Sequence, residues 1–325
     1  NLGLAYISRI LFSIIETIHK NPSYSKKVLD VLSYLNYKKA IDIIFQKQVT
    51  LRSLKLIYQY STYDELIADL PHFDIDLSYF SNHPEKWNKF TDLCKRIHHS
   101  SKARKYNLKI SEGKISTTFE NVSDLLLLLD TNIFKLKDVM LFDTSTYTRF
   151  SIIQASSGEQ SVILSILAIA SKIEDNTLIC IDEPEICLHP EWQEKYIELL
   201  TKTFGNYNNC HFIIATHSPQ IISNLKSDNC FILQMESKKL NNAKDFVNNS
   251  IDFQLAKLFN APGFKNEYLS RIALNIFTKV SRRKNFDLED IKNYELLEDQ
   301  SINMKNDDPV YELFQAIKKL REIYG

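Results

Sequence analysis

Two adjacent acids follow a short apolar run in the middle of the chain. The run is "LICI", and Asp182 and Glu183 come directly after it. A buried strand that ends in two carboxylates places both of them at the carboxyl edge of a parallel sheet, where ligands bind in open α/β folds. There, Asp182 could hold Mg²⁺ through water, and Glu183 could orient and polarise an attacking water. A strand that ends in ordinary solvated acids is the alternative that these two residues alone leave open.

Polar residues on either side of the acids could complete a phosphate site. His217 follows the apolar run "HFIIA" within "THSP", so it should lie beside Glu183 at the same sheet edge, where it could hydrogen-bond a γ-phosphate. Ser157 and Gly158, in "SSGEQ", open a predicted helix, and a helix N-terminus with a small residue and a free hydroxyl can bind an anion. Each has a simpler explanation when taken alone. His217 could be a polar strand end, and the serine a plain N-cap.

The segment that must position these residues alternates strands with helices. Apolar strands are predicted at "TLICIDE", "HFIIA" and "CFILQ", and amphipathic helices at "SSGEQSVILSILAIASKI" and "PEWQEKYIELLTKTF". Pro190 lies in the first turn of the second helix, where proline is favoured. Fully apolar strands that alternate with amphipathic helices predict an α/β fold with a parallel sheet covered on both sides.

The rest of the chain divides by its pattern of apolar residues. Residues 1–103 are predicted to be a helical insertion or arm, because segments such as "SKKVLDVLSYLNYKKAIDIIF" have helical spacing. Residues 104–155 are predicted to be a mixed β/α part of the α/β domain, with a hairpin in "NLKISEGKISTTFE" and strands around "VMLFDT" and "RFSIIQA". Residues 156–238 form the predicted core, and residues 239–325 a helical C-terminal region.

The last predicted helix has an apolar stripe with two interpretations. Its members follow helical spacing and are Val310, Leu313, Phe314, Ile317 and Leu320. The stripe could dock a partner protein, or it could pack on the α/β domain of the chain itself.

Composition restricts the class of protein only weakly. The 325 residues are 44% hydrophobic, and 40 basic residues balance 40 acidic ones, so net charge neither indicates nor excludes nucleic acid. Five cysteines without CxxC spacing predict reduced core thiols in a cytoplasmic protein. The apolar N-terminal stretch is interrupted by Arg9 and Glu16, so we expect no membrane span. Two basic stretches could contact phosphates, although such runs are commonly solvated helix faces: Lys95, Arg96, Lys102, Arg104 and Lys105, and Lys279, Arg282, Arg283 and Lys284.

A glycine-rich phosphate loop is absent from these residues. The chain has six glycines, and its one Gly-Lys pair is Gly113-Lys114, at the turn of the predicted hairpin. Neither the glycine spacing nor the Ser or Thr of GxxxxGK[ST] is present there. We expect that an N-terminal lobe with this loop is missing and that Asn1 lies inside a longer protein. A degenerate head that binds nucleotide weakly is the alternative.

Taken together, the motifs resemble those of ATP-binding-cassette (ABC) ATPases, and more narrowly the SMC, RecF and OLD-like branch. "SSGEQ" is similar to the signature motif, "LICIDE" to the Walker B strand, "PEICLHP" to the D-loop region and "THSP" to the switch histidine motif. The similarity covers residues 150–235. The resemblance implies an ABC-ATPase-type parallel sheet flanked by helices, with ATP and Mg²⁺ as cofactors. It also implies a set of site residues: Asp182 for the metal, Glu183 and His217 for catalysis, and Ser157, Gly158 and Gln160 for the nucleotide.

The resemblance further implies partners. In this family the signature of one head faces the γ-phosphate held by another, which implies a homodimer or higher oligomer. A compact head with a helical insertion and a helical tail looks most like the PtuA-like ATPase subunits of Septu and retron-associated anti-phage systems, which pair with an HNH-type nuclease. DNA or RNA is a further implied contact, as is a reverse transcriptase with its msDNA. A nucleotide-binding scaffold without hydrolysis and a RecF/OLD-like DNA-repair ATPase are the alternatives.

The sequence also predicts that the chain itself does not cut nucleic acid. No Glu…Asp-x-Asp set of the kind found in Toprim nuclease domains follows Met235.

Overall fold

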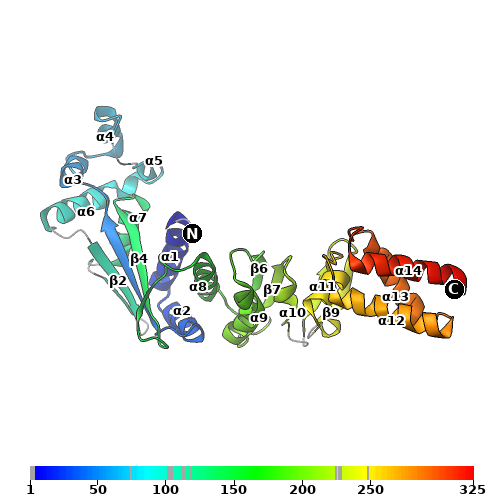
Figure 1. Cartoon of the computed structure of the whole chain (residues 1–325). Coiled ribbons are helices and arrows are strands. Elements are labelled where there is room, and N and C mark those ends of the chain that lie inside the picture. The colour runs from blue at the N-terminus through cyan, green and yellow to red at the C-terminus, as the bar shows by residue number, and fades with distance from the viewer. Residues whose placement is uncertain are drawn as a thin grey trace. The chain divides into compact units, whose positions relative to one another are not determined.

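The computed structural model divides into two compact units (Figure 1). It describes residues 4–73, 75, 77–100, 105–111, 114–117, 119, 121–223, 225, 229–246 and 249–325. The first unit comprises Asn1–Ile179 and Lys202–His211, and the second comprises Cys180–Thr201 and Phe212–Gly325. Within the described residues, no helix has the combination of length and apolar character that crossing a membrane requires.

A five-stranded antiparallel sheet organises the first unit. Its order is β3-β2-β1-β4-β5, with β1 at Ala40–Lys47, β2 at Lys105–Ser111, β3 at Lys114–Thr117, β4 at Phe134–Phe142 and β5 at Arg149–Ser151. Alternate side chains of β1 are fully buried, as are alternate side chains of β2. This pattern is typical of an antiparallel sheet with one face against the core. The predicted β2–β3 hairpin is confirmed, although Gly113 in its turn lies outside the described residues.

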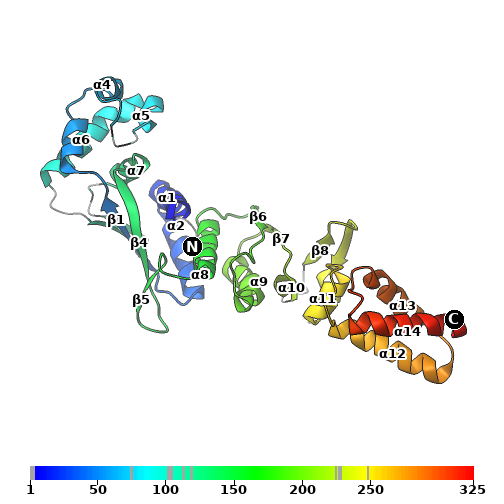
Figure 2. The same ribbon diagram turned by 45° about the horizontal axis from the view of Figure 1, so that its top comes forward.

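Helices of the first unit form two groups. Figures 1 and 2 show α1, α2 and α8 together on one side of the sheet, and α2 contacts both β1 and β2. Helix α1 spans Leu4–Lys20, α2 spans Ser23–Tyr34 and α8 spans Ser157–Ala170. Helix α7, at Val122–Asp130, contacts α1, α6 and β4. Among the described residues between β1 and β2, the chain forms the α-helices α3 (Leu51–Ile57), α4 (Tyr63–Asp69), α5 (Tyr79–Asn82) and α6 (Trp87–Ser100) and the short 3-10 helix η1 (Pro84–Lys86). The rings of Phe80, Trp87 and Phe90 pack together at α5 and α6.

The predicted helical character of residues 1–103 is wrong for residues 40–47, which form the central strand β1. In "AIDIIFQK", the set Ile41, Ile44 and Phe45 fits a helical period, while Ile41, Ile43 and Phe45 fit a strand. The second set is the fully buried one. Pairing with β2 on one side and β4 on the other decides between the two periods.

We expect Phe45→Ala to destabilise the protein strongly. Phe45 is fully buried in the central strand, and a buried phenylalanine truncated to alanine typically costs about 3–5 kcal/mol through lost burial and the cavity left behind. Asn107→Ala on the exposed side of β2 is the matched control, with an expected change within about 0.5 kcal/mol. Urea unfolding would measure both values, and equal stabilities of the two variants would contradict this description of the core.

Strands β6 (Leu178–Asp182) and β7 (His211–Ala215) pair with each other. At their starts, the Thr177 carbonyl accepts a hydrogen bond from the His211 N–H; at their ends, the Glu183 N–H donates to the Ala215 carbonyl. The two strands therefore run in the same direction. Helix α9, at Pro190–Phe204, makes the connection between them, and α10 follows at Pro219–Ser223.

The α/β class with helices around the sheets is confirmed, but two details of the predicted sheet are wrong. Strand β8 (Phe231–Gln234) pairs antiparallel with β9 (Lys239–Asn242) through a short turn, in which Lys238 adopts a positive φ of 52°. The apolar strands are also not covered on both sides within the described residues. Leu178 on β6, Ile213 on β7 and Phe231 on β8 are 60%, 52% and 61% exposed.

The prediction of core thiols is only partly right. None of the five cysteines forms a disulfide in the part of the chain that the structure describes, and burial raises the pKa of the Cys94 thiol. Cys180 and Cys187 are exposed, because Cys180 shares the uncovered face of β6 and Cys187 lies in the loop that follows.

The C-terminal helices have a hydrophobic core of their own. Helices α12 (Glu267–Arg283), α13 (Leu288–Ser301) and α14 (Pro309–Tyr324) lie side by side in Figures 1 and 2, and α11 (Ile251–Lys257) precedes them. The predicted apolar stripe of α14 lies in this core. Val310, Phe314 and Ile317 are buried there, with Leu313 and Leu320 packed against it. The stripe therefore packs within the chain, and the docking interpretation is not supported.

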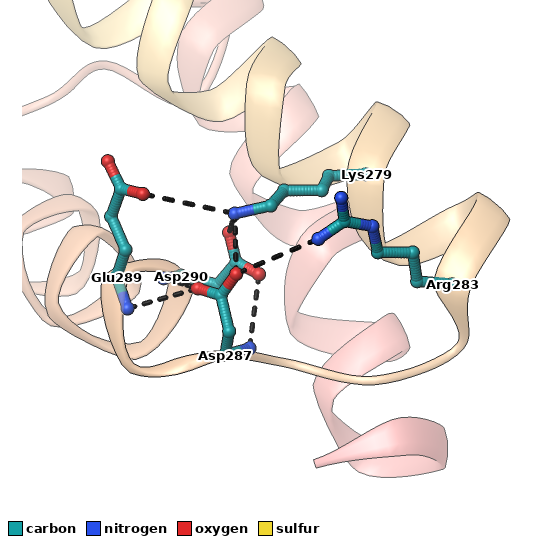
Figure 3. Close-up of polar contacts among 5 residues, drawn as sticks. All are labelled: Lys279, Arg283, Asp287, Glu289 and Asp290. Carbon is teal, nitrogen blue, oxygen red and sulfur yellow. Dashed lines mark hydrogen bonds and ion pairs between the residues drawn. The ribbon is translucent and has the colours of Figure 1, made fainter.

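Charged residues fix the corner between α12 and α13 (Figure 3). The Lys279 ammonium lies 2.6 Å from an Asp287 carboxylate oxygen and 3.1 Å from one of Asp290. Asp287 is the N-cap of α13, and Asp290 completes a capping box with it. Arg283 lies 4.0 Å from Asp287. Two cations of the predicted basic stretch therefore have partners inside the bundle.

We expect Lys279→Met to raise the pKa of Asp287. The hydrogen bond from Lys279, followed by the backbone N–H of Asp290, lowers this pKa from 3.8 to about 2. A carboxylate with a depressed folded pKa stabilises the fold fully above its unfolded pKa, and this stabilisation is lost as the pH falls from about 4 to about 2. An NMR titration of the Asp287 carboxyl would measure the shift. The exposed Lys292 of α13 supplies the control Lys292→Met, and an equal change in both variants would contradict the assignment.

Candidate functional site

The predicted acids stand where β6 ends. Asp182 is the last residue of the strand and is exposed. Glu183 follows with a φ of +42°, in the left-handed region that non-glycine residues rarely adopt. Its N–H donates to the Ala215 carbonyl at 2.8 Å, which holds this conformation against the end of β7. Such backbone conformations persist only where the surroundings enforce them.

The predicted proximity of Glu183 and His217 is confirmed. Glu183 Oε1 lies 3.4 Å from His217 Nε2. The His217 side chain is 84% exposed and that of Glu183 is 39% exposed, so a ligand or solvent molecule has access to both. The catalytic roles assigned to them stay predictions. What the geometry establishes is a carboxylate and an imidazole that face each other beyond the carboxyl ends of two parallel strands.

Ser157 does not cap the N-terminus of α8. Ser156 is the N-cap, and its hydroxyl accepts a hydrogen bond from the Glu159 N–H at 3.3 Å. Glu159 returns the contact by accepting from the Ser156 N–H at 2.9 Å, which completes a capping box. The plain N-cap interpretation thus applies to Ser156. Ser157, half-buried in the first turn beside buried Gly158, remains the candidate for an anion contact.

Gln160 has a structural position that the sequence did not indicate. It is buried, and its side-chain Nε2 donates to the carbonyls of Ile152, Ile153 and Ala155. In this arrangement its amide nitrogen secures the segment that leads into α8. The direct nucleotide contact predicted for Gln160 stays a prediction, and a positioning role has the better geometric support.

Three site residues were missed by the sequence analysis. Glu185 Oε1 accepts a hydrogen bond from the backbone N–H of His217 at 2.6 Å. The Ser218 hydroxyl donates to Gln193 Oε1 at 2.7 Å. The second acid of "DEPE" was a visible signal for Glu185, but no local pattern indicates that Gln193, on α9, contacts Ser218.

The predicted residues fall into two groups that are described separately. Ser157, Gly158 and Gln160 belong to the first unit, whereas Asp182, Glu183 and His217 belong to the second. Among the described residues, no group of three or more His, Cys, Asp or Glu side chains is arranged to hold a metal ion. Mg²⁺ commonly uses one or two carboxylates together with water and substrate phosphates. The exposed carboxylate of Asp182 is a donor of that type.

Part of the positive charge in the predicted basic stretch near residue 100 is already paired within the chain. Arg96 lies 3.3 Å from the buried carboxylate of Asp124, which Lys89 also contacts at 3.0 Å. Lys102 and Arg104 lie outside the described residues. Nucleic-acid binding by either basic stretch therefore stays a prediction.

Comparison with known proteins defines the class to which this chain belongs. Residues 38–223 match the family described as "AAA domain, putative AbiEii toxin, Type IV TA system". The match covers more than half of the chain, and the chain is a member of this family. The matched range includes each candidate site residue, from Ser157 to His217.

Two curated relatives are similar over a shorter stretch. The Retron Ec83 probable ATPase of Escherichia coli is 35% identical over 99 residues, which is 27% of this chain and 18% of that protein. The Retron Vc95 probable ATPase of Vibrio cholerae serotype O1 biovar El Tor is 31% identical over 97 residues, which is 26% of this chain and 18% of that protein. The similar stretch thus spans less than a fifth of either relative.

Proposed function

We propose that this chain supplies the residues that hydrolyse ATP in a Mg²⁺-dependent ATPase. The observation that carries the proposal is Glu183 beside His217, at the carboxyl ends of the paired strands β6 and β7, with Asp182 next to it. A scaffold that binds nucleotide without hydrolysis has no use for a carboxylate and an imidazole held face to face. The names of both curated relatives contain "probable ATPase", which agrees with this assignment.

Each of the three side chains has a distinct proposed task. Asp182, exposed at the strand end, holds Mg²⁺ through water. Glu183, fixed by its backbone bond to Ala215, orients the attacking water and accepts its proton. His217 hydrogen-bonds the γ-phosphate and registers its loss. The metal supplies neutralisation of the phosphate charge when it is bound.

The proposed nucleotide site needs a phosphate loop, and we propose that it comes from outside these 325 residues. The uncovered apolar faces of β6, β7 and β8 support this, because exposed apolar strands normally pack against another layer. In this proposal, a segment with the loop covers Ile213 and Phe231. Ser157 and Gly158 then serve a second copy of the protein, which makes the closed state a homodimer.

We further propose that the ATPase controls a separate nuclease in anti-phage defence of the retron or Septu kind, in the cytoplasm. Support comes from the retron names of the relatives and from the catalytic inventory. In this proposal Asp182 and Glu183 serve ATP and are not available to cut nucleic acid. The partner is an HNH-type nuclease, and DNA or RNA is the target.

Purification of the natural full-length protein, with and without its neighbouring gene product, tests the partner proposal. Each preparation is incubated with DNA, tRNA and Mg²⁺. Cleavage only in the presence of the partner supports the proposal. Cleavage by the ATPase alone, which persists in Asp182→Ala, refutes it.

A further inference from the structure

The loop after β6 returns toward the end of β7 through two tight turns. The Ile186 N–H donates to the Glu183 carbonyl at 3.1 Å, and the Leu188 N–H donates to the Glu185 carbonyl at 2.9 Å. Cys187, between them, has a φ of +68°. This path brings the Glu185 side chain to the backbone of His217, where Oε1 accepts the N–H at 2.6 Å. A hydrogen bond to an ionised acceptor is short and stronger than a neutral one.

The backbone on both sides of His217 is also held. Before it, the Ala215 carbonyl accepts the N–H of Glu183 at 2.8 Å. After it, the Ser218 hydroxyl donates to Gln193 Oε1, and Gln193 Nε2 donates to the Leu188 carbonyl at 3.0 Å. The imidazole itself is largely exposed, so surrounding side chains do little to hold it. Its position relative to Glu183 therefore depends on the backbone that these contacts secure.

We infer that Glu185 is a positioning residue that holds His217 opposite Glu183. The inference rests on the proposed function for its consequence in turnover, but the contact itself does not depend on that function. Glu185 acts through the His217 backbone and is not placed in contact with ATP. Its second oxygen, Oε2, is buried and has no hydrogen-bond partner among the described residues. A buried oxygen without a partner costs stability.

Because Oε2 of Glu185 is buried, the effect of Glu185→Ala on the position of His217 can be separated from its effect on folding. Glu185→Ala removes one hydrogen bond and, with it, one unsatisfied buried oxygen. These two changes oppose each other, so the variant stays folded. The freed N–H of His217 can bind water, because this residue is exposed. Glu185→Gln keeps a side-chain oxygen of the same reach.

The test combines one spectroscopic and one kinetic measurement on the natural full-length protein. The backbone amide proton of His217 should have a strongly downfield NMR shift in the wild type, should keep part of it in Glu185→Gln, whose neutral amide oxygen is a weaker acceptor, and should lose it in Glu185→Ala. With ATP, Glu185→Ala should lower kcat by about 10–100-fold, the range that is typical when outer-shell partners that orient the ligands of a metal site are removed. KM should stay within about twofold, and Glu185→Gln should restore most of kcat. Glu191→Ala, on the exposed side of α9, is the control and should change neither measurement.

Each outcome decides the inference. An unchanged His217 amide shift in Glu185→Ala overturns it. So does a raised KM with an unchanged kcat, because Glu185 would then serve binding. If the wild type hydrolyses no ATP, the proposed function fails, and the amide shift alone decides whether Glu185 positions His217.

Discussion

Glu183→Gln should bind Mg-ATP like the wild type and hydrolyse it about 10²–10⁴-fold more slowly. This factor is the usual contribution of a positioned general base. Glutamine has nearly the same shape and keeps an oxygen within reach of His217, but it cannot take a proton from water. In the proposed site Asp182 is left to serve the metal, so binding of the nucleotide should persist. Phosphate release and nucleotide affinity, measured on the natural full-length protein, separate the two effects.

Two further variants make this result specific to the site. His217→Ala should also slow turnover without unfolding the strand ends, because its side chain is 84% exposed and contributes little packing. Glu191→Ala removes a carboxylate from the same region of the chain, where it pairs with Lys195 at the surface of α9, and should leave turnover unchanged. Hydrolysis by Glu183→Gln at the wild-type rate would show that another residue activates the water.

Ser157→Arg should abolish the ATP-dependent association of two copies while each copy stays folded. Ser157 lies in the first turn of α8, and Ser156 with Glu159 performs the capping there. The substitution therefore leaves the cap intact. It introduces a long cation at a helix N-terminus, where the positive end of the helix dipole disfavours it, and it occupies the space proposed for the partner's γ-phosphate.

A sizing experiment with Glu183→Gln as the parent would measure this association, because slow hydrolysis preserves the closed state. Ser157→Ala is the matched control and should lower the affinity of the closed state only modestly, since it removes the hydroxyl without filling the site. Circular dichroism would verify the fold of both variants. Unchanged ATP-dependent association of Ser157→Arg would contradict the proposed contact between copies.

The sequence indicated the carboxyl edge of β6 and β7 because its signals are local. Apolar runs that end in polar residues predict strand ends, and two parallel strands place those ends together. That reasoning correctly placed His217 near Glu183, which the 3.4 Å separation confirms. The capping box of α8 is also a local pattern, although the sequence did not show which of two adjacent serines, Ser156 or Ser157, would cap the helix.

The misassigned features depend on pairing over long sequence distances. The helical period of Ile41, Ile44 and Phe45 is overridden because β1 pairs with β2 and β4, which follow it by many residues. Whether the apolar faces of β6 and β8 are covered depends on which other layer packs against them, and the apolar runs themselves do not specify that layer. Glu185 was missed for the same reason, since its partner is a backbone N–H at the far end of the next strand.

ATP turnover decides most directly whether this chain carries the hydrolytic residues of an ATPase. Phosphate release is measured with Mg²⁺ on the natural full-length protein, beside Glu183→Gln from the same preparation. We expect steady phosphate release by the wild type, its loss when Mg²⁺ is removed, and nucleotide binding by both proteins with release by the wild type alone. A wild-type protein that binds Mg-ATP and releases no phosphate would show instead that the chain is part of a nucleotide-binding scaffold.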